Sequence, residues 1–238
     1  MTTERGGPMM VARLKEEARV PDMTYRYQFQ DGGSASFSIK PASPPAEAEL
    51  PGWTELGFHQ CPNCPLSAEA APHCPMAVAF IPLIEAFGKR LSYDTVTVQV
   101  ESSERTVSKT TSLQQAVGSL MGLLAATCAC PRTDFLKPMA RFHLPFANEQ
   151  ETIYRVASMY LLVQYFERGR GREPDWELKK LHTNYEELQT VNAAMAARLR
   201  TITEKDSTLN ALVILDLLAK ALPYSINDML EDVRGAFE

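Results

Sequence analysis

The stretch FHQCPNCPLSAEAAPHCP, residues 58–75, holds Cys61, Cys64 and Cys74, and each of these cysteines stands directly before a proline. Cys61 and Cys64 have the C-x-x-C spacing that lets two thiolates reach one metal ion. A fourth Cys-Pro pair begins at Cys130, far along the chain. Because a tetrahedral zinc ion needs four ligands, the sequence predicts one metal centre formed by these four cysteines. Such a centre would pin an irregular loop to a distant part of the fold.

Three other interpretations of the cysteines remain open at this point. His59 and His73 flank the cysteines, and either one can replace a thiolate in the predicted ligand set. The same four cysteines can hold an iron–sulfur cluster, although their spacing matches no standard ferredoxin pattern, and zinc is therefore preferred. The plainest interpretation is that they are small buried hydrophobic residues. Cys128 lacks a following proline and is predicted to lie outside the site.

Short strands are predicted on both sides of the cysteine stretch. From Tyr25 to Phe29 aromatic residues alternate with polar ones, a turn sequence follows at 31–33, and the alternation then resumes. This pattern indicates a β-hairpin. Valines alternate again at 96–100, and a return strand around Val107 completes a second predicted hairpin.

The chain becomes helical in character from Thr111 onward, because apolar residues then recur every three or four positions in four successive stretches. A capping box is expected at Thr111 and Gln114, and another at Asn148 and Glu151 opens the second of these helices. One further helix is predicted earlier, at 76–89. Short connections between long helices favour antiparallel neighbours, so a helical bundle is predicted.

The longest predicted helix, from about Asp175 to Ile202, carries a continuous apolar seam that must be buried. We expect the seam to pack against other helices of the same chain, since two more long amphipathic helices are available. The alternative is a homodimer in which Asn192 pairs across a two-fold axis. The seam consists of Leu178, Leu181, Tyr185, Leu188, Met195 and Leu199.

A second cluster of polar residues lies close in sequence to Cys130. Arg141 and His143 are embedded there among aromatic residues and prolines. They can be read as an anion-binding or acid–base pocket, in which arginine binds a carboxylate or phosphate and histidine carries a proton. The preferred interpretation is structural, with both side chains satisfying backbone carbonyls of an ordered loop.

Composition argues against several classes of protein. The net charge of −5 disfavours a general nucleic-acid-binding surface, which shows a basic excess. The beginning of the chain lacks the apolar run of a signal peptide, and the most apolar stretch, 211–222, is too short to span a bilayer. A cytoplasmic location is therefore expected, where C-x-x-C is typical of metal or redox sites. The sequence carries no Walker loop, G-x-G-x-x-G, G-x-S-x-G or H-E-x-x-H motif, so no reaction is predicted.

The cysteine stretch, the segment MARFHLPFANEQETIYR at 139–155 and the tripeptide PDW at 174–176 together resemble an uncharacterised bacterial domain family of unknown function. The resemblance covers the chain from about Tyr25 to Leu217. It implies no activity, and it implies one complete domain of bacterial origin.

These observations predict an α+β protein in which two short β-hairpins and a cysteine-rich metal loop pack on an antiparallel helical bundle. Residues 1–22 are expected to form a flexible tail and 41–52 a linker. One domain is expected over 23–238, strand-rich with the metal loop at 23–110 and helical at 111–238. The predicted function is that of a non-enzymatic metal-binding protein with structural zinc, acting as an interaction or regulatory module. The alternative is an iron–sulfur redox protein or enzyme. The expected partner is another protein, and binding to nucleic acid or to a membrane is not expected. The chain is expected to be a monomer or a homodimer.

Overall fold

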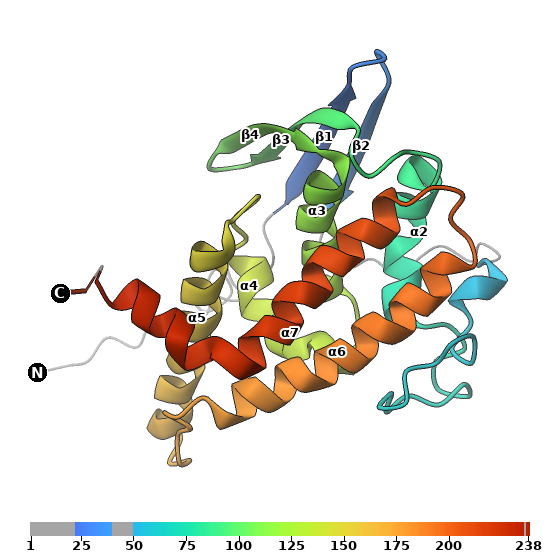
Figure 1. Cartoon of the computed structure of the whole chain (residues 1–238). Coiled ribbons are helices and arrows are strands. Elements are labelled where there is room, and N and C mark those ends of the chain that lie inside the picture. Colours follow the sequence, from blue (N-terminus) through green and yellow to red (C-terminus); the bar gives the residue numbers. More distant parts are fainter. Residues whose placement is uncertain (1–21, 40–49, 236) are drawn as a thin grey trace, which may run out of the picture.

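The computed structural model of the chain describes residues 22–39, 50–235 and 237–238 (Figure 1). The predicted tail at 1–22 therefore lies outside the described residues except for residue 22. The predicted linker at 41–52 lies outside them except for residues 50–52. Helices and one four-stranded antiparallel sheet make up the described part, so the predicted α+β class is confirmed.

Both predicted hairpins belong to one sheet, whose strand order is β2-β1-β3-β4. The strands are β1 Met23–Phe29, β2 Ser34–Ile39, β3 Thr95–Ser102 and β4 Thr106–Ser112. The central pair, β1 and β3, comes from the two different hairpins, with Tyr25 opposite Val100 and Tyr27 opposite Val98. Local alternation predicts each hairpin but says nothing of this pairing, because the two strands are separated by the whole cysteine segment.

The helices cover only one face of the sheet (Figure 1). Tyr25, Tyr27, Val98 and Val100 point to that face and are almost fully buried, whereas the residues between them on β3 are exposed. Alternation with a period of two produces this division, because successive side chains of a strand point to opposite faces. Burial of each large apolar side chain contributes roughly 1.5–3 kcal/mol, which fixes the register of the central pair.

Two helices lie directly beneath the sheet. They are α2, Pro75–Phe87, and α3, Leu113–Thr127. Phe87 of α2 packs against Tyr27, with ring centroids 4.9 Å apart, and the Tyr27 hydroxyl donates a hydrogen bond of 3.1 Å to the Ala116 carbonyl of α3. The Tyr27 hydroxyl is thus satisfied although the ring is buried, as a buried polar group requires.

The remaining helical elements follow α3 along the chain. They are the 3-10 helix η2, Pro131–Leu136, and the α-helices α4, Lys137–Arg141, α5, Glu149–Gly169, α6, Lys179–Arg200, and α7, Ser207–Arg234. Helices α6 and α7 run side by side in opposite directions (Figure 1). Every residue of the predicted α6 seam, from Leu178 to Leu199, is buried. The seam is therefore covered within one chain, as the preferred interpretation predicts.

The helix boundaries confirm one predicted cap and correct two other predictions. Asn148 and Glu151 form a reciprocal capping box at the start of α5, as expected. The capping box predicted at Thr111 and Gln114 is wrong, because Thr111 is paired with Val96 inside β4, Ser112 is the residue before α3, and the Thr111 hydroxyl bonds Gln115 instead. Helix α6 begins after Leu178, whose left-handed backbone, φ 61°, interrupts the helix expected from Asp175.

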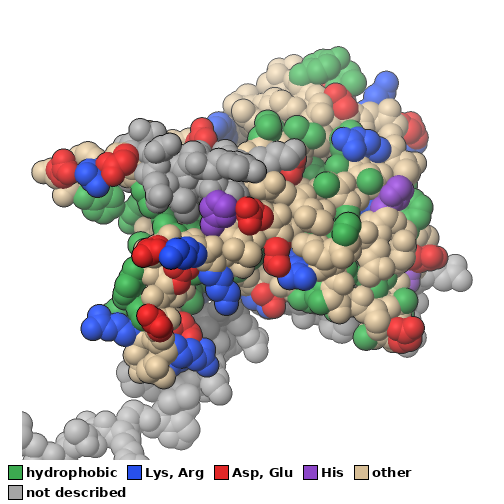
Figure 2. All heavy atoms as spheres, turned by 60° about the horizontal axis from the view of Figure 1, so that its bottom comes forward, with side chains coloured by type: hydrophobic (Ala, Val, Ile, Leu, Met, Phe, Trp, Pro, Cys, Tyr) green, Lys and Arg blue, Asp and Glu red, His purple; other side chains and the backbone are tan. Residues whose placement is uncertain are grey.

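Acidic and basic side chains are interspersed on the molecular face drawn in Figure 2, with hydrophobic side chains scattered between them. Among the described residues no single helix is both long and apolar enough to cross a membrane. In the same part of the chain, α3 taken together with the segment Pro131–Arg141, across a bend of 112°, is long and apolar enough by length and composition.

Candidate metal centre

Cys61 and Cys64 stand at the two ends of a β-turn. The Cys64 N–H donates a hydrogen bond of 2.9 Å to the Cys61 carbonyl, the bond that closes such a turn. Pro62 occupies the second position of the turn, where its fixed φ is favourable. The proline after Cys61 therefore has a local cause, since it shapes the turn that keeps the two cysteines close together.

Cys74 and Cys130 each stand immediately before a helix. Cys74 is the N-cap residue of α2 and Cys130 is that of η2, and both have an extended backbone. A residue before proline favours this conformation, and proline suits the first helical position because its missing N–H is not needed there. Both cysteines are buried, at 8% and 9% exposure. The two Cys-Pro pairs thus place two thiols at helix starts inside the protein.

The four predicted ligands act on one another electrostatically. The pKa of Cys61 is raised to about 11, first by burial and then by Cys74, Cys64 and Cys130. Burial also raises the pKa of the Cys130 thiol, and Cys74 and Cys64 add to that effect. Thiolates raise one another's pKa in this way only when they are near neighbours. The fold therefore gathers the C-x-x-C turn, the start of α2 and the start of η2 into one neighbourhood.

The spacing of these side chains falls short of a formed site. No group of three or more His, Cys, Asp or Glu side chains in the described part of the chain is arranged as ligands around one ion. The metal centre at Cys61, Cys64, Cys74 and Cys130 therefore stays a prediction. Their shared neighbourhood favours it, and the donor set suits zinc or an iron–sulfur cluster, which both prefer thiolates.

Arg198 of α6 is buried beside the thiols, with an exposure of 1%. Its guanidinium donates hydrogen bonds to the carbonyls of Trp53, Glu55 and Leu56, at 2.7, 2.8 and 2.9 Å. Burial lowers its pKa, and the neighbouring groups that oppose this effect, when they are ionised, are the thiols of Cys74, Cys61 and Cys64.

No carboxylate forms an ion pair with Arg198 within the described residues. Buried charges are normally paired, because an isolated charge loses its hydration. Arg198 is thus a buried cation, and the neighbouring groups that can carry a negative charge are the thiols of Cys74, Cys61 and Cys64.

A second arginine attaches the cysteine turn to the helices. Arg132 of η2 donates to the Asn63 carbonyl at 2.7 Å and forms an ion pair of 2.8 Å with Glu187 of α6. The Asn63 side chain also donates to the Glu187 carbonyl, at 3.0 Å. Residues of the C-x-x-C turn, η2 and α6 therefore hold one another directly.

Sequence reasoning missed Arg198 and Arg132. Arg198 follows Val191 and Met195 at intervals of four and three on the buried side of α6. A single charge in an apolar series is the signal that could have identified it, because such a charge must find a buried partner. Arg132 directly follows Cys130-Pro131 but stands in no pattern that distinguishes it from a surface arginine.

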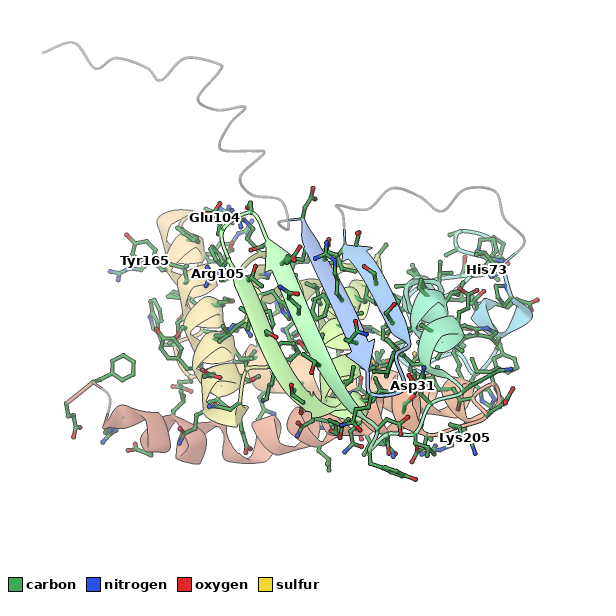
Figure 3. The ribbon with its side chains drawn as sticks, turned by 90° about the horizontal axis from the view of Figure 1, so that it is seen from above. Asp31, His73, Glu104, Arg105, Tyr165 and Lys205 are labelled. Atoms are coloured by element: carbon green, nitrogen blue, oxygen red, sulfur yellow. The ribbon has the colours of Figure 1, made fainter. Side chains whose placement is uncertain are left out.

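The two histidines have other surroundings. His59 is exposed and has a left-handed backbone, φ 47°. His73 is half-buried and its Nδ1 atom lies 2.8 Å from the Thr54 hydroxyl; Figure 3 shows it beside the η1 turn, Gly52–Thr54. Neither is among the groups that shift the pKa of Cys61.

Cys128, predicted to lie outside the site, follows the last turn of α3. Its thiol donates a hydrogen bond of 3.2 Å to the carbonyl of Ala125, so the thiol is already engaged at the end of its own helix. Its pKa is raised to about 11, mainly by burial, and Cys130 and Cys74 also raise it. Cys128 is therefore a neighbour of two of the four predicted ligands, Cys130 and Cys74.

His143 belongs to a polar network beneath the sheet. Its Nε2 atom lies 2.5 Å from the Tyr25 hydroxyl, which is also 3.1 Å from the Ser119 hydroxyl. Burial, with a smaller contribution from Arg155, lowers the pKa of His143 to about 3. A histidine that is neutral throughout the physiological range does not serve as a proton carrier near neutral pH. The geometry of His143 thus favours the structural interpretation.

Arg141 and His143 belong to different contacts. The Arg141 guanidinium lies 5.4 Å from the centre of the neighbouring Phe142 ring. Arg155 is the cation that acts on His143, and it donates to the carbonyls of Met139 and Phe142 at 2.9 Å each. These bonds hold the loop that ends α4 against α5.

Comparison with known proteins finds no match among curated proteins and none among solved structures. One family model matches residues 23–238, and its description is that of a domain of unknown function. The predicted resemblance to an uncharacterised family is therefore confirmed, and the match extends beyond the expected end at Leu217. The chain belongs to the family described as Domain of unknown function (DUF6901).

Proposed function

We propose that the chain is a non-enzymatic metal-binding protein in which Cys61, Cys64, Cys74 and Cys130 hold one structural zinc ion. The observation that carries the proposal is the burial of Arg198 among these thiols, where its charge lacks a carboxylate partner in the described residues.

Charge balance links Arg198 to a metal. With its pKa raised to about 11, Cys61 is a neutral thiol near pH 7 when no metal is bound, so it offers Arg198 no negative charge. A bound metal keeps its thiolate ligands deprotonated, and four thiolates around a divalent zinc ion leave two negative charges. The bound state therefore supplies the counter-charge that a buried guanidinium requires.

The role of the ion in this proposal is structural. Zinc would hold the cysteine turn, the start of α2 and the start of η2 together, and Arg132 and Arg198 would attach this unit to α6. The metal loop would then pack on the helices, which we take to be an antiparallel bundle. A structural zinc site contributes its binding energy to folding.

The proposed biological role is that of an interaction or regulatory module whose partner is another protein. The neutral, hydrogen-bonded state of His143 supports a non-enzymatic role, because the most suggestive acid–base residue of the sequence is used in packing. A cytoplasmic location remains part of the proposal.

Metal content tests the proposal directly. The full chain is purified without chelator from cells supplied with both zinc and iron, and zinc, iron and protein are quantified. We expect about one zinc ion per chain. A brown protein with iron and sulfide would replace zinc by the iron–sulfur alternative, since zinc is colourless. Protein that contains neither metal would overturn the site.

Matched cysteine variants assign the ligands. Cys61→Ser and Cys130→Ser should each lose most of the metal, whereas Cys128→Ser should keep it, because the Cys128 thiol already bonds Ala125. Equal metal content in all three variants would contradict the ligand assignment.

A further inference from the structure

Helix α5 has an apolar face that the described elements leave largely exposed. One side of the helix is buried through Ile153, Val156, Ala157 and Gln164. The opposite side carries a group of large hydrophobic residues with exposures from 47% to 63%, namely Tyr154, Leu162, Tyr165 and Phe166. Figure 3 shows Tyr165 projecting from α5 away from the rest of the molecule.

The spacing of these residues makes a stripe along the helix. Tyr154, Ser158, Leu162 and Tyr165 follow one another at intervals of four, four and three, which places them on the same side of an α-helix. Ser158 is the polar member of the stripe, and its small side chain leaves room for a neighbouring helix to approach closely. Phe166 packs edge-to-face on Tyr165, with centroids 5.7 Å apart, and widens the stripe.

The exposed area is large for a single helix. At one end of the stripe the Tyr154 ring has the Phe237 ring 6.2 Å away, yet Tyr154 remains 47% exposed. Each aromatic side chain has about 150–250 Å² to bury, so three rings that are each about half exposed offer on the order of 300 Å². Patches of about 300–600 Å² on a monomer are often functional. Such a patch is enough for the apolar centre of an interface that buries about 800 Å² on each partner.

The two ends of the stripe have opposite charge. Glu149 and Glu151 lie in the first turn of α5. Arg168 lies in its last turn, and Arg170 and Arg172 follow. The latter two share the carboxylate of Glu167 while remaining 66% and 69% exposed. With the exposed Glu173 counted as well, residues 167–173 hold three arginines and two glutamates, so this end keeps an excess of one positive charge.

We propose that a second copy of this chain covers the face, with the two α5 helices packed antiparallel about a two-fold axis between Ser158 and Leu162. In this arrangement Tyr154 lies opposite the partner's Phe166, and the acidic start of each helix meets the basic end of the other. A two-fold interface requires a self-complementary surface, and a helix with a mainly apolar middle and oppositely charged ends is one.

A second copy fits this charge pattern better than a lipid surface does. An anionic membrane attracts an amphipathic helix that is basic along its polar edges. The glutamates at the start of α5 oppose that orientation, whereas they are neutralised in an antiparallel pair. The proposal does not depend on the metal centre, because α5 carries none of the four cysteines.

The mass of the full chain in solution tests the interface, measured by light scattering and sedimentation velocity from about 1 to 100 µM. We expect a dimer whose dissociation constant rises at least about a hundredfold in Tyr165→Glu, because two-fold symmetry introduces the carboxylate twice. Tyr93→Glu is the matched control, since Tyr93 is exposed to a similar extent, 69% against 63%, and lies between α2 and β3. This control should remain dimeric. Circular dichroism and urea unfolding establish that each variant is folded.

Two outcomes would overturn the proposal. The first is a wild-type monomer at the highest concentration, or a dimer that Tyr165→Glu leaves intact. The second is binding to vesicles rich in phosphatidylglycerol that Tyr165→Glu abolishes, which would assign the face to a membrane. Loss of the dimer with full zinc content would support the interface and leave the metal proposal unaffected.

Discussion

Arg198→Met is the substitution that best examines how the buried arginine and the cysteines depend on each other. Methionine keeps an unbranched, though shorter, apolar side chain and removes the charge and the donors. The carbonyls of Trp53, Glu55 and Leu56 then lose the bonds of 2.7–2.9 Å that Arg198 makes.

The size of the effect follows from these contacts. Each buried carbonyl left without a donor costs about 1–3 kcal/mol, and three carbonyls lose their donor. Removal of the buried charge itself is favourable and offsets part of that cost. We expect the free energy of unfolding to fall by about 3 kcal/mol in metal-free protein. When zinc is bound, the variant also loses the attraction between Arg198 and the anionic site. Groups that support metal ligands typically change metal affinity roughly 10–100-fold, which corresponds to a further loss of about 1.4–2.8 kcal/mol.

The assay is urea unfolding of wild type and variant, each measured with saturating zinc and with chelator. The difference between the two losses is the coupling between Arg198 and the metal. Arg155→Met is the control, because Arg155 also donates to two backbone carbonyls but has no cysteine among the groups that shift its pKa. Its loss should be the same with and without zinc.

Zero coupling would refute the reasoning. If Arg198→Met reduces stability equally in both conditions, Arg198 holds the loop by hydrogen bonds alone and does not compensate an anionic centre. A variant that is more stable than wild type with zinc bound would be equally decisive.

Further expectations concern the thiols, a histidine and the α6 seam. In the same urea assay with zinc bound, Cys61→Ser and Cys64→Ser should each lower the free energy of unfolding by several kcal/mol, and Cys128→Ser by about 1 kcal/mol. Equal losses in all three variants would mean that these cysteines are ordinary packing residues. The pKa of His143 is about 3 in the folded protein and about 6.5 when unfolded, so the unfolded state binds more protons between these values. The free energy of unfolding should therefore fall by up to about 1.4 kcal/mol per pH unit as the pH drops below 6.5. His143→Gln should flatten that slope when unfolding is measured from pH 7 to pH 4. An unchanged slope would contradict a buried, neutral His143. The side-chain nitrogen of Asn192 is buried without a hydrogen-bond partner among the described residues, so Asn192→Leu should keep or raise the thermal midpoint and leave the mass in solution unchanged; a new oligomeric state would favour pairing of this residue between copies.

The sequence alone was sufficient for features that depend on neighbouring residues. Alternation at Tyr25 and Tyr27 predicts a strand with one buried face, and the Asn148–Glu151 spacing predicts the cap of α5, because both arise within a few residues. The Thr111 prediction failed because the hairpin pairing of β3 with β4 extends the strand through Ser112, and this pairing outweighs the local capping pattern.

The candidate site divides in the same way. The sequence predicts the helix that begins after Cys74, and the turn at Cys61 is seen in the structure; both are local consequences of proline. The positive charge beside them was not predicted, because Arg198 lies far beyond Cys74 in the chain and on a different helix.

Sequence by itself therefore determined the fold class, the family and the four candidate ligands, since residue type, spacing and period carry that information. Tertiary structure alone decided that β1 pairs with β3, that the thiols share a neighbourhood and that Arg198 is buried among them. The physical reason is that burial and charge pairing are set by which distant segments the core brings into contact, and those contacts leave no local pattern in the chain.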